Sequence, residues 1–142
     1  MNPWIIDIGY LILLLCLVIM IVASVVIMIA RKRKKKNVKP TVISLLIGIL
    51  LLGVLILYIV SHSTYYKYND WFIIDSNIHI VQQKYGDFDL GTITENKAGR
   101  VAYYIYTDNG PIIPDHLKHY YYMEYDEWGV IYKVYEGCQP GG

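Results

Sequence analysis

The chain contains only two cysteines, and its first 30 residues contain no lysine or arginine. Cys16 and Cys138 lie far apart in dissimilar surroundings, so we expect no disulfide between them, and any folded part must be stabilised by packing. The sequence also has no Gly-rich phosphate loop, no GxSxG motif and no HExxH motif. These absences argue against nucleotide-binding enzymes, serine hydrolases and zinc proteases. We therefore expect a protein without catalytic activity and without a cofactor.

Charge is distributed very unevenly along the chain. Of the 13 lysines and arginines, seven lie in residues 31–40 and six lie in residues 61–142. Of the 12 acidic residues, only Asp7 lies in residues 1–60, and the other 11 give residues 61–142 a net charge of 6 − 11 = −5. The whole-chain net charge of +1 is therefore an average over unlike parts and says nothing about binding partners.

Two long apolar runs flank the basic segment. The run Leu11–Ile29, with the apolar residues before it, and the run Val42–Val60 each reach the roughly 20 residues that an α-helix needs to cross about 30 Å of hydrocarbon. Neither run has the polar face, repeating every ~3.6 residues, of a helix at the surface of a soluble protein. Residues 1–60 are thus predicted to be a membrane hairpin of two transmembrane helices. The small residues Ser44 and Gly48 are expected to let these helices pack on each other.

The basic segment determines the predicted orientation. Because positive charge resists transfer across a membrane, loop 31–40 is expected in the cytoplasm and both chain termini outside. A cleaved signal peptide is the alternative for the first run, but that run is long, has no basic residues before it and is followed by basic rather than small residues. Nucleic-acid binding fits poorly between two closely spaced spans, whereas anionic lipid headgroups fit well. The predicted headgroup contacts are Arg31, Lys32, Arg33, Lys34, Lys35 and Lys36.

Residues 61–142 are predicted to form a small extracytoplasmic α+β domain. We expect residues 61–70 to be a tether, and residues 71–74 are an apolar run too short for a helix. Ser76 is a suitable N-cap for a helix of two to three turns, and Gly86 suits its C-terminal end. Apolar residues between them recur at spacings of three and four, which is typical of one face of a helix.

Three β-strands are predicted after this helix. They are rich in Tyr, Val and Ile and are separated by turn residues. The predicted strands are Arg100–Thr107, Lys118–Tyr125 and Val130–Tyr135. The last two form a hairpin whose turn closes on Gly129 in a left-handed conformation. The expected fold of residues 71–136 is one short helix packed on a three-stranded antiparallel sheet, with residues 137–142 as a flexible tail.

Two short patterns in this domain resemble a known class of proteins. Ile73–Asp89 contains I-I-D-S-x-x-x-x-V-x-x-K-Y-G-D-F-D, and Tyr121–Val134 reads Y-Y-M-E-Y-D-E-W-G-V-I-Y-K-V. Over residues 71–135 the chain resembles small bacterial envelope domains of the barrel-assembly lipoprotein (SmpA/BamE) type and the β-lactamase-inhibitor-protein type. Asp75 stands where those families usually have glycine, which predicts a strained backbone there. The resemblance implies a helix-plus-sheet fold and a non-enzymatic protein-binding role in a bacterial envelope.

Tyrosine is the most unusual component of the outer domain, with 13 of the 15 tyrosines in residues 61–142. Tyrosine combines an apolar ring with a polar hydroxyl and is enriched at protein interfaces. One helix covers only one face of a sheet, so several tyrosines are expected on the other face. Alternation alone does not tell which face meets the helix, because both carry aromatic residues. The candidate binding-surface residues are Tyr121, Tyr125, Tyr132 and Tyr135.

Three other groups of residues could carry chemistry. His116 and His119 beside Asp115 offer too few ligands for a metal site. The acidic residues of loop 87–95 lack the ligand spacing of a calcium-binding loop. Cys138 lies in a Gly- and Pro-rich tail that is poorly suited to hold a base, so we expect a free thiol or an intermolecular disulfide. No metal is expected.

These features together predict a function. The chain is expected to be a non-enzymatic protein-interaction module of a bacterial cell envelope, integral to the cytoplasmic membrane, whose outer domain binds another envelope protein. The alternative is an accessory subunit of a larger membrane complex that acts through its transmembrane hairpin. An enzyme is the least favoured class, because no cluster of catalytic residues stands out in the sequence.

Overall fold

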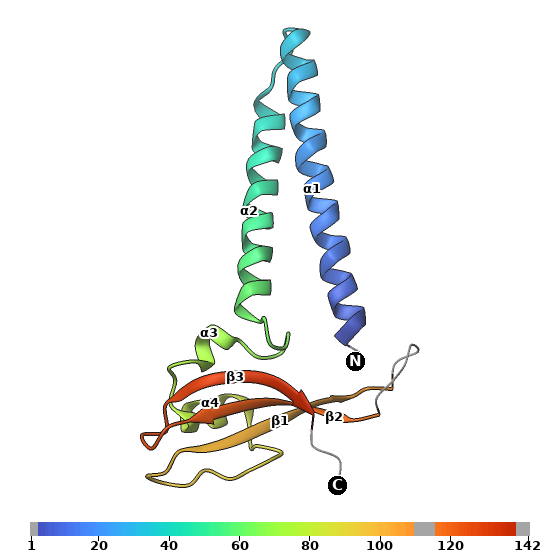
Figure 1. Ribbon diagram of the computed structural model, residues 1–142. Coiled ribbons are helices and arrows are strands. Elements are labelled where there is room, and N and C mark those ends of the chain that lie inside the picture. The colour runs from blue at the N-terminus through green and yellow to red at the C-terminus, as the bar shows by residue number, and fades with distance from the viewer. Residues whose placement is uncertain (1–2, 110–115, 139–142) are drawn as a thin grey trace. The chain divides into compact units, whose positions relative to one another are not determined.

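The computed structural model describes residues 3–109 and 116–138, with elements in the order α1–α2–α3–α4–β1–β2–β3 (Figure 1). These residues divide into two compact units, residues 3–60 and the residues from Ser61 onward. The division falls where the apolar composition of the chain gives way to polar and aromatic residues. Each unit therefore has its own composition and its own packing.

The first unit is a hairpin of two long apolar helices. α1 spans Pro3–Arg33 (31 residues) and α2 spans Lys39–Ser61 (23 residues). Among the described residues, these two helices are long and apolar enough to cross a membrane, with mean hydropathies of 3.4 and 3.0. Only 6% of the most apolar stretch of each helix is buried, whereas the core helix of a soluble protein is mostly buried.

Small residues line the contact between α1 and α2. The hydroxyl oxygens of Ser24 and Ser44 lie 3.5 Å apart. A Cβ atom on Gly48 would lie only 2.8 Å from Cε of Met20, so the absence of a side chain there allows the two helices to approach closely. Ser44 and Gly48 are one turn apart and on the same face of α2. The prediction that they mediate packing within the hairpin is confirmed.

The second unit is built on a three-stranded antiparallel sheet in which β2 is the central strand. The strands are β1 (Gly99–Thr107), β2 (Lys118–Tyr125) and β3 (Ile131–Cys138). The predicted sheet is confirmed, but its last strand continues past Tyr135. Gly137 and Cys138, which the sequence placed in a flexible tail, pair with β2 instead. The remaining tail residues, 139–142, lie outside the described residues.

The helix α4 (Ile78–Tyr85) packs on one face of the sheet, as predicted (Figure 1). Its N-cap is Asn77, one residue later than the expected Ser76, and the Asn77 side chain accepts the backbone N–H of His79 at 2.9 Å. Gly86 ends the helix with φ +97°, a conformation that a side chain would strain. Local capping thus sets both ends of this short helix.

The turn before α4 is bonded directly to the β2–β3 hairpin. Asp75 has φ +65°, which confirms the predicted strain at this position. Gly129 has φ +76°, which confirms its predicted left-handed conformation. The backbone N–H of Asp75 donates to the carbonyl of Ile131 at 2.8 Å. The N–H of Ile78 donates to the carbonyl of Gly129, also at 2.8 Å. These bonds hold the strained turn in place and anchor the start of the helix to the sheet.

Tyrosine rings supply much of the hydrophobic core. The ring of Tyr68 lies at the centre of the core. Its centroid is 4.7 Å from that of Tyr121, 5.2 Å from that of Tyr85 and 5.2 Å from that of Tyr103, on which it stacks. Aromatic pairs of this kind contribute about 0.5–1.5 kcal/mol each beyond the burial of their area. The buried residues of the core are Tyr65, Tyr68, Ile73, Ile78, Val81, Val101, Tyr103, Tyr121, Met123, Tyr125 and Ile131.

Residues 61–70 belong to this core, so the prediction of a tether is wrong. Tyr65 and Tyr68 are buried, and Asp70 is only 3% exposed. The Asp70 carboxylate accepts the hydroxyl of Tyr121 at 2.6 Å. The polar composition of the segment suggested a tether, but its polar groups are bonded inside the domain and its rings complete the core.

A single helical turn, α3 (Asp70–Ile73), occupies the region where the sequence predicted no helix. Asn69 caps this turn by accepting the backbone N–H of Phe72 at 3.0 Å. The N–H of Ile74 donates to the carbonyl of Asp70 at 2.9 Å and closes the turn. The prediction for residues 71–74 is therefore wrong, because an asparagine cap can stabilise one turn where no helical periodicity exists.

Candidate functional site

The two faces of the sheet have different surroundings. The core face meets α4 and contributes Val101, Tyr103, Tyr121, Met123 and Tyr125 to the core. On the opposite face, the strand register places Arg100 beside Glu124 and Tyr104 beside Tyr120. We call this opposite face the tyrosine face. Its members are Arg100, Ala102, Tyr104, Lys118, Tyr120, Tyr122, Glu124, Lys133 and Tyr135.

Four tyrosine rings form a continuous row across the tyrosine face. The ring centroids of Tyr104 and Tyr120 lie 5.7 Å apart, those of Tyr120 and Tyr122 lie 6.0 Å apart, and those of Tyr122 and Tyr135 lie 5.3 Å apart. Tyr120 and Tyr122 are buried, whereas Tyr104 is 42% exposed. Leu90, from the loop before β1, packs beside the buried pair. The rings are therefore ordered by their neighbours, which lowers the entropic cost of presenting them to a partner.

Two cations lie against these rings. The guanidinium carbon of Arg100 is 5.1 Å from the centroid of Tyr122, and an Arg100 nitrogen donates to the Tyr135 hydroxyl at 3.3 Å. This hydrogen bond raises the pKa of Arg100 above its ordinary value. Lys133 Nζ lies 4.7 Å from the Tyr135 centroid and 3.6 Å from a Glu124 carboxylate oxygen. Burial raises the pKa of Tyr122, so this hydroxyl stays neutral where Arg100 lies over the ring.

Charge on the tyrosine face is opposite to that of the rest of the domain. The face carries Arg100, Lys118 and Lys133, which are three of the six basic residues in 61–142, but only Glu124 of the 11 acidic ones. Its formal charge is 3 − 1 = +2, whereas the rest of residues 61–142 amounts to 3 − 10 = −7. The face therefore combines an aromatic surface with a local excess of positive charge.

Two of the predicted binding-surface residues lie in the core, so their assignment to the surface is wrong. Tyr121 and Tyr125 are 0% and 1% exposed. The Tyr121 hydroxyl donates to buried Asp70, and the Tyr125 hydroxyl accepts the backbone N–H of Thr94 at 3.2 Å. Both hydroxyls thus have partners inside the domain, which allows tyrosine to occupy positions where an aliphatic residue would be expected.

The other two predicted residues lie on or beside the tyrosine face. Tyr135 is a member of the ring row, and Tyr132 is 56% exposed with its hydroxyl 3.4 Å from a Glu124 oxygen. The prediction missed Tyr104 and Arg100 on β1. Both residues pair with even-numbered residues of β2. Assigning those β2 residues to the tyrosine face would therefore have identified Tyr104 and Arg100 as well.

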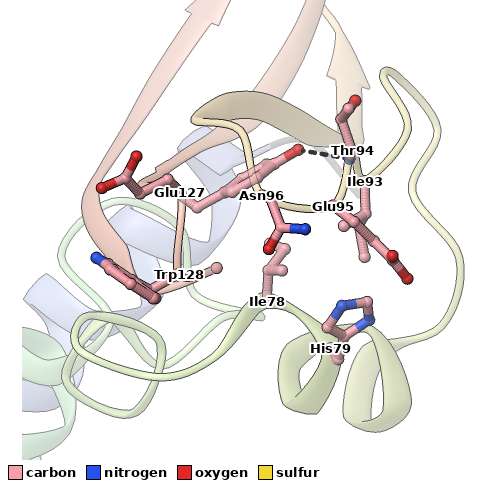
Figure 2. Close-up of a pocket in the computed structure, with 10 residues that line it drawn as sticks. Ile78, His79, Ile93, Thr94, Glu95, Asn96, Glu127 and Trp128 are labelled. Carbon is pink, nitrogen blue, oxygen red and sulfur yellow. Dashed lines mark hydrogen bonds between the residues drawn. The ribbon is translucent and has the colours of Figure 1, made fainter.

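A separate cavity of about 250 Å³ lies between the start of α4, the loop before β1 and the β2–β3 turn (Figure 2). In Figure 2 the side chains of His79 and Asn96 face the space above Ile78, while the carboxylates of Glu95 and Glu127 point away from it. The two acidic groups therefore do not converge on a common point. This arrangement offers two hydrogen-bonding groups over an apolar floor and no paired carboxylates for acid–base chemistry.

The predicted lipid-binding residues lie at the connection between α1 and α2. Arg31, Lys32 and Arg33 form the last turn of α1, where positive charge is favoured by the helix dipole. Arg31 donates to the carbonyl of Asn37 at 3.4 Å, and Lys32 to Lys36 are exposed. Their contact with anionic headgroups stays a prediction.

The histidines and acidic residues that were considered as metal ligands do not form a metal site in the described residues. Across residues 3–109 and 116–138, no group of three or more His, Cys, Asp and Glu side chains is arranged to hold a metal ion. His116 Nδ1 lies 3.1 Å from the amide oxygen of Asn109, and His119 faces Glu136 instead. Asp115 lies outside the described residues.

Comparison with known proteins finds no protein-family model, no curated protein and no solved structure that matches this chain. The resemblance of residues 71–135 to the barrel-assembly lipoprotein (SmpA/BamE) and β-lactamase-inhibitor-protein types therefore stays a prediction. A fold of this kind can in any case host unrelated functions, so function must be argued from the surface itself.

Proposed function

We propose that this chain is an integral membrane protein of a bacterial envelope whose outer domain binds an acidic segment of another protein through a surface that catalyses no reaction. The binding surface is the tyrosine face. The single observation that carries this proposal is the charge segregation, because a formal charge of +2 is gathered on one aromatic face of a domain that is otherwise −7. Such a pattern steers and orients a partner of opposite charge.

The proposed location follows from the hairpin. α1 and α2 have the length and composition of membrane spans, and the seven basic residues between positions 31 and 40 favour a cytoplasmic connection. The second helix then leads outward, so the domain that begins at Ser61 lies on the extracytoplasmic side. The proposed partner must therefore also lie on the extracytoplasmic side.

Cysteine labelling tests this orientation. In a chain made cysteine-free by Cys16→Ser and Cys138→Ser, a single Lys97→Cys or Lys36→Cys substitution places a thiol at an exposed position in the outer domain or the connection. We expect a membrane-impermeant maleimide to label Lys97→Cys in intact cells and to label Lys36→Cys only after permeabilisation. Labelling of Lys36→Cys in intact cells would overturn the orientation.

The chemistry of the tyrosine face indicates what the partner presents. Arg100 offers a planar group that pairs with carboxylates through two parallel hydrogen bonds, and Lys133 adds a second positive charge beside it. Exposed Tyr104 and Tyr132 supply apolar area with few rotatable bonds. An acidic protein segment with aliphatic or aromatic side chains complements both properties.

Paired charge reversals test the binding surface. A photo-crosslinking phenylalanine derivative at Tyr132 is expected to give a discrete adduct in native membranes. Arg100→Glu with Lys133→Glu should reduce its yield about tenfold or more, since two charged contacts contribute on the order of 1–2 kcal/mol each. The matched control, Lys67→Glu with Lys97→Glu, makes the same change in net charge elsewhere in the domain and should leave the yield unchanged.

The cross-linker at Trp71 is the control for position, because Trp71 is similarly exposed (59%) but lies on α3. Circular dichroism shows whether each variant is folded. An adduct that forms equally well from Trp71, or that both charge-reversed pairs reduce alike, would contradict binding at the tyrosine face. The absence of any adduct from Tyr132 would contradict it as well.

A further inference from the structure

Four polar side chains meet at one end of the core face, away from the tyrosine face. They come from all three strands, because the register places Tyr106 of β1 beside His119 of β2, and His119 beside Cys138 of β3. Glu136 lies two residues before Cys138 and therefore on the same face. The sequence left Cys138 without a base, but the continuation of β3 brings it to a histidine.

The four groups are within contact distance of one another. His119 Nδ1 lies 3.0 Å from Glu136 Oε1, and the same oxygen accepts the Tyr106 hydroxyl at 2.8 Å. The Tyr106 ring stacks on the His119 ring at a centroid distance of 4.4 Å. Cys138 Sγ lies 3.6 Å from His119 Nε2 and 3.7 Å from Nδ1. The imidazole is thus hydrogen-bonded to the Glu136 carboxylate, stacked on the Tyr106 ring and in contact with the Cys138 sulfur.

This geometry selects the chemical state of the imidazole. A carboxylate accepts hydrogen bonds only, so the contact with Glu136 favours the tautomer that carries its proton on Nδ1. Nε2 is then unprotonated, while Cys138 Sγ, almost equidistant from the two ring nitrogens, lies against the ring. Proton transfer to Nε2 therefore needs a small shift of the thiol into line with the Nε2 lone pair. A thiol beside a histidine that a third group orients is the arrangement that activates nucleophilic cysteines.

We infer that Cys138 is a nucleophilic thiol, with His119 as its base and Glu136 as the residue that positions His119, and that its substrate is a disulfide. His119 Nε2 takes the thiol proton. The thiolate sulfur attacks one sulfur of the disulfide, a new S–S bond forms and the old S–S bond breaks. The leaving sulfur departs as a thiolate and takes the proton from the imidazolium. The product is a mixed disulfide at Cys138 and one free thiol.

The charges around the site favour the thiolate only through His119. A protonated imidazole in contact with the sulfur stabilises its negative charge, whereas the carboxylate of Glu136 opposes it. Burial and the bond to Glu136 raise the pKa of Tyr106, so its hydroxyl stays protonated and shares the charge of Glu136. The Tyr65 hydroxyl, which also lies within electrostatic range of Glu136, stays neutral because burial raises its pKa.

This site does not depend on the proposed function. It lies on the opposite face of the sheet from Arg100 and Lys133, and its chemistry needs no protein partner. A disulfide-bearing substrate is available on the extracytoplasmic side of a membrane, where disulfides persist. The assignment of that compartment rests on the proposed orientation, but the reactivity itself can be measured on purified protein.

The test uses the full chain in detergent with Cys16→Ser, so that Cys138 is the only thiol. The rate of alkylation by iodoacetamide is measured against pH. We expect half of the maximal rate at least about one pH unit below the value of about 8.5 for an ordinary thiol. His119→Gln should return the midpoint to about 8.5, and Glu136→Gln should give an intermediate midpoint. His79→Gln, at an exposed position on α4, is the matched control and should leave it unchanged.

Exchange with the aromatic disulfide DTNB tests the reaction itself. At pH 7, His119→Gln should slow formation of the mixed disulfide about threefold, since a roughly tenfold loss of thiolate is offset in part by the greater nucleophilicity of the more basic sulfur. The urea-unfolded chain provides a second reference if His119→Gln does not fold. Equal midpoints for the folded protein and for either reference would overturn the inference.

Discussion

Raising the pH above about 10 is expected to unfold the domain that begins at Ser61 in one steep transition. The core tyrosines Tyr65, Tyr68, Tyr103 and Tyr121 are at most 7% exposed, and burial raises the pKa of each above its ordinary value. The unfolded chain releases these protons near pH 10 while the folded chain retains them, so the unfolded state binds fewer protons. The stabilisation is therefore fully present below about pH 10 and is lost as the pH rises above it.

The size of this effect follows from linkage. Each buried tyrosine lowers the free energy of unfolding by up to about 1.4 kcal/mol per pH unit, and four together lower it by up to about 5 kcal/mol per unit. A domain of this size has about 4–12 kcal/mol in total at roughly 0.05–0.15 kcal/mol per residue. Near-UV circular dichroism of the full chain in detergent, followed against pH, should thus show unfolding between about pH 10 and about pH 12.

Tyr68→Phe is the matched variant for this titration. It keeps the ring that packs on Tyr103 and Tyr121 but removes one ionisable hydroxyl. The transition should move to higher pH and release about one proton fewer. A domain that stays folded beyond about pH 12, or a Tyr68→Phe variant that unfolds with the same slope and midpoint, would contradict the role of buried tyrosines.

Replacing Asp70 by alanine is expected to cost about 3–5 kcal/mol of stability. Its carboxylate accepts the Tyr121 hydroxyl at 2.6 Å, the backbone N–H of Thr64 at 2.7 Å and the Ser63 hydroxyl at 2.9 Å. Asp70→Ala leaves all three donors without this acceptor, and one of them belongs to a fully buried residue. Each buried donor left unpaired costs about 1–3 kcal/mol. Chemical denaturation of the full chain in detergent, monitored by near-UV circular dichroism, measures the loss.

Two control variants separate this bond network from general effects of mutation. Tyr121→Phe removes one hydroxyl from the network and should cost about 1.5–3 kcal/mol, the usual contribution of one hydrogen bond to a charged group. Asp87→Ala removes an exposed carboxylate that bonds Gln82 and should change stability by less than about 0.5 kcal/mol. Similar losses for Asp70→Ala and Asp87→Ala would contradict a structural role for the buried carboxylate.

Much of the fold could be predicted because its signals are local. The length of the apolar runs predicted both long helices, and the small residues Ser44 and Gly48 predicted how these helices meet. Turn residues and alternation predicted three strands, and Gly129 adopts the expected left-handed turn. The turn α3 and the buried segment 61–70 could not be predicted this way. Both depend on hydrogen bonds formed by Asn69 and Asp70, which have no counterpart in hydrophobic periodicity.

The candidate site was harder to predict for a related physical reason. β2 reads Lys-His-Tyr-Tyr-Tyr-Met-Glu-Tyr, so both of its faces carry tyrosine and alternation cannot identify the buried one. Tyr121 and Tyr125 are buried because Asp70 and Thr94 supply partners for their hydroxyls, and these partners lie far away in the sequence. The Cys138–His119 contact depends in turn on β3 extending beyond Tyr135, which a Gly-containing sequence does not indicate.

The participation of residues 61–70 in the core also sets an order of events during synthesis. Asp70 and Tyr121 are 51 positions apart, and Tyr68 packs on rings from two strands that are made later. Contacts of such long range close large loops and form slowly compared with local turns. The contacts of Asp70 and Tyr68 with Tyr121 therefore cannot form until β2 has been made, and only then can the core close. The first residues of the domain to be synthesised are among the last to reach their final neighbours.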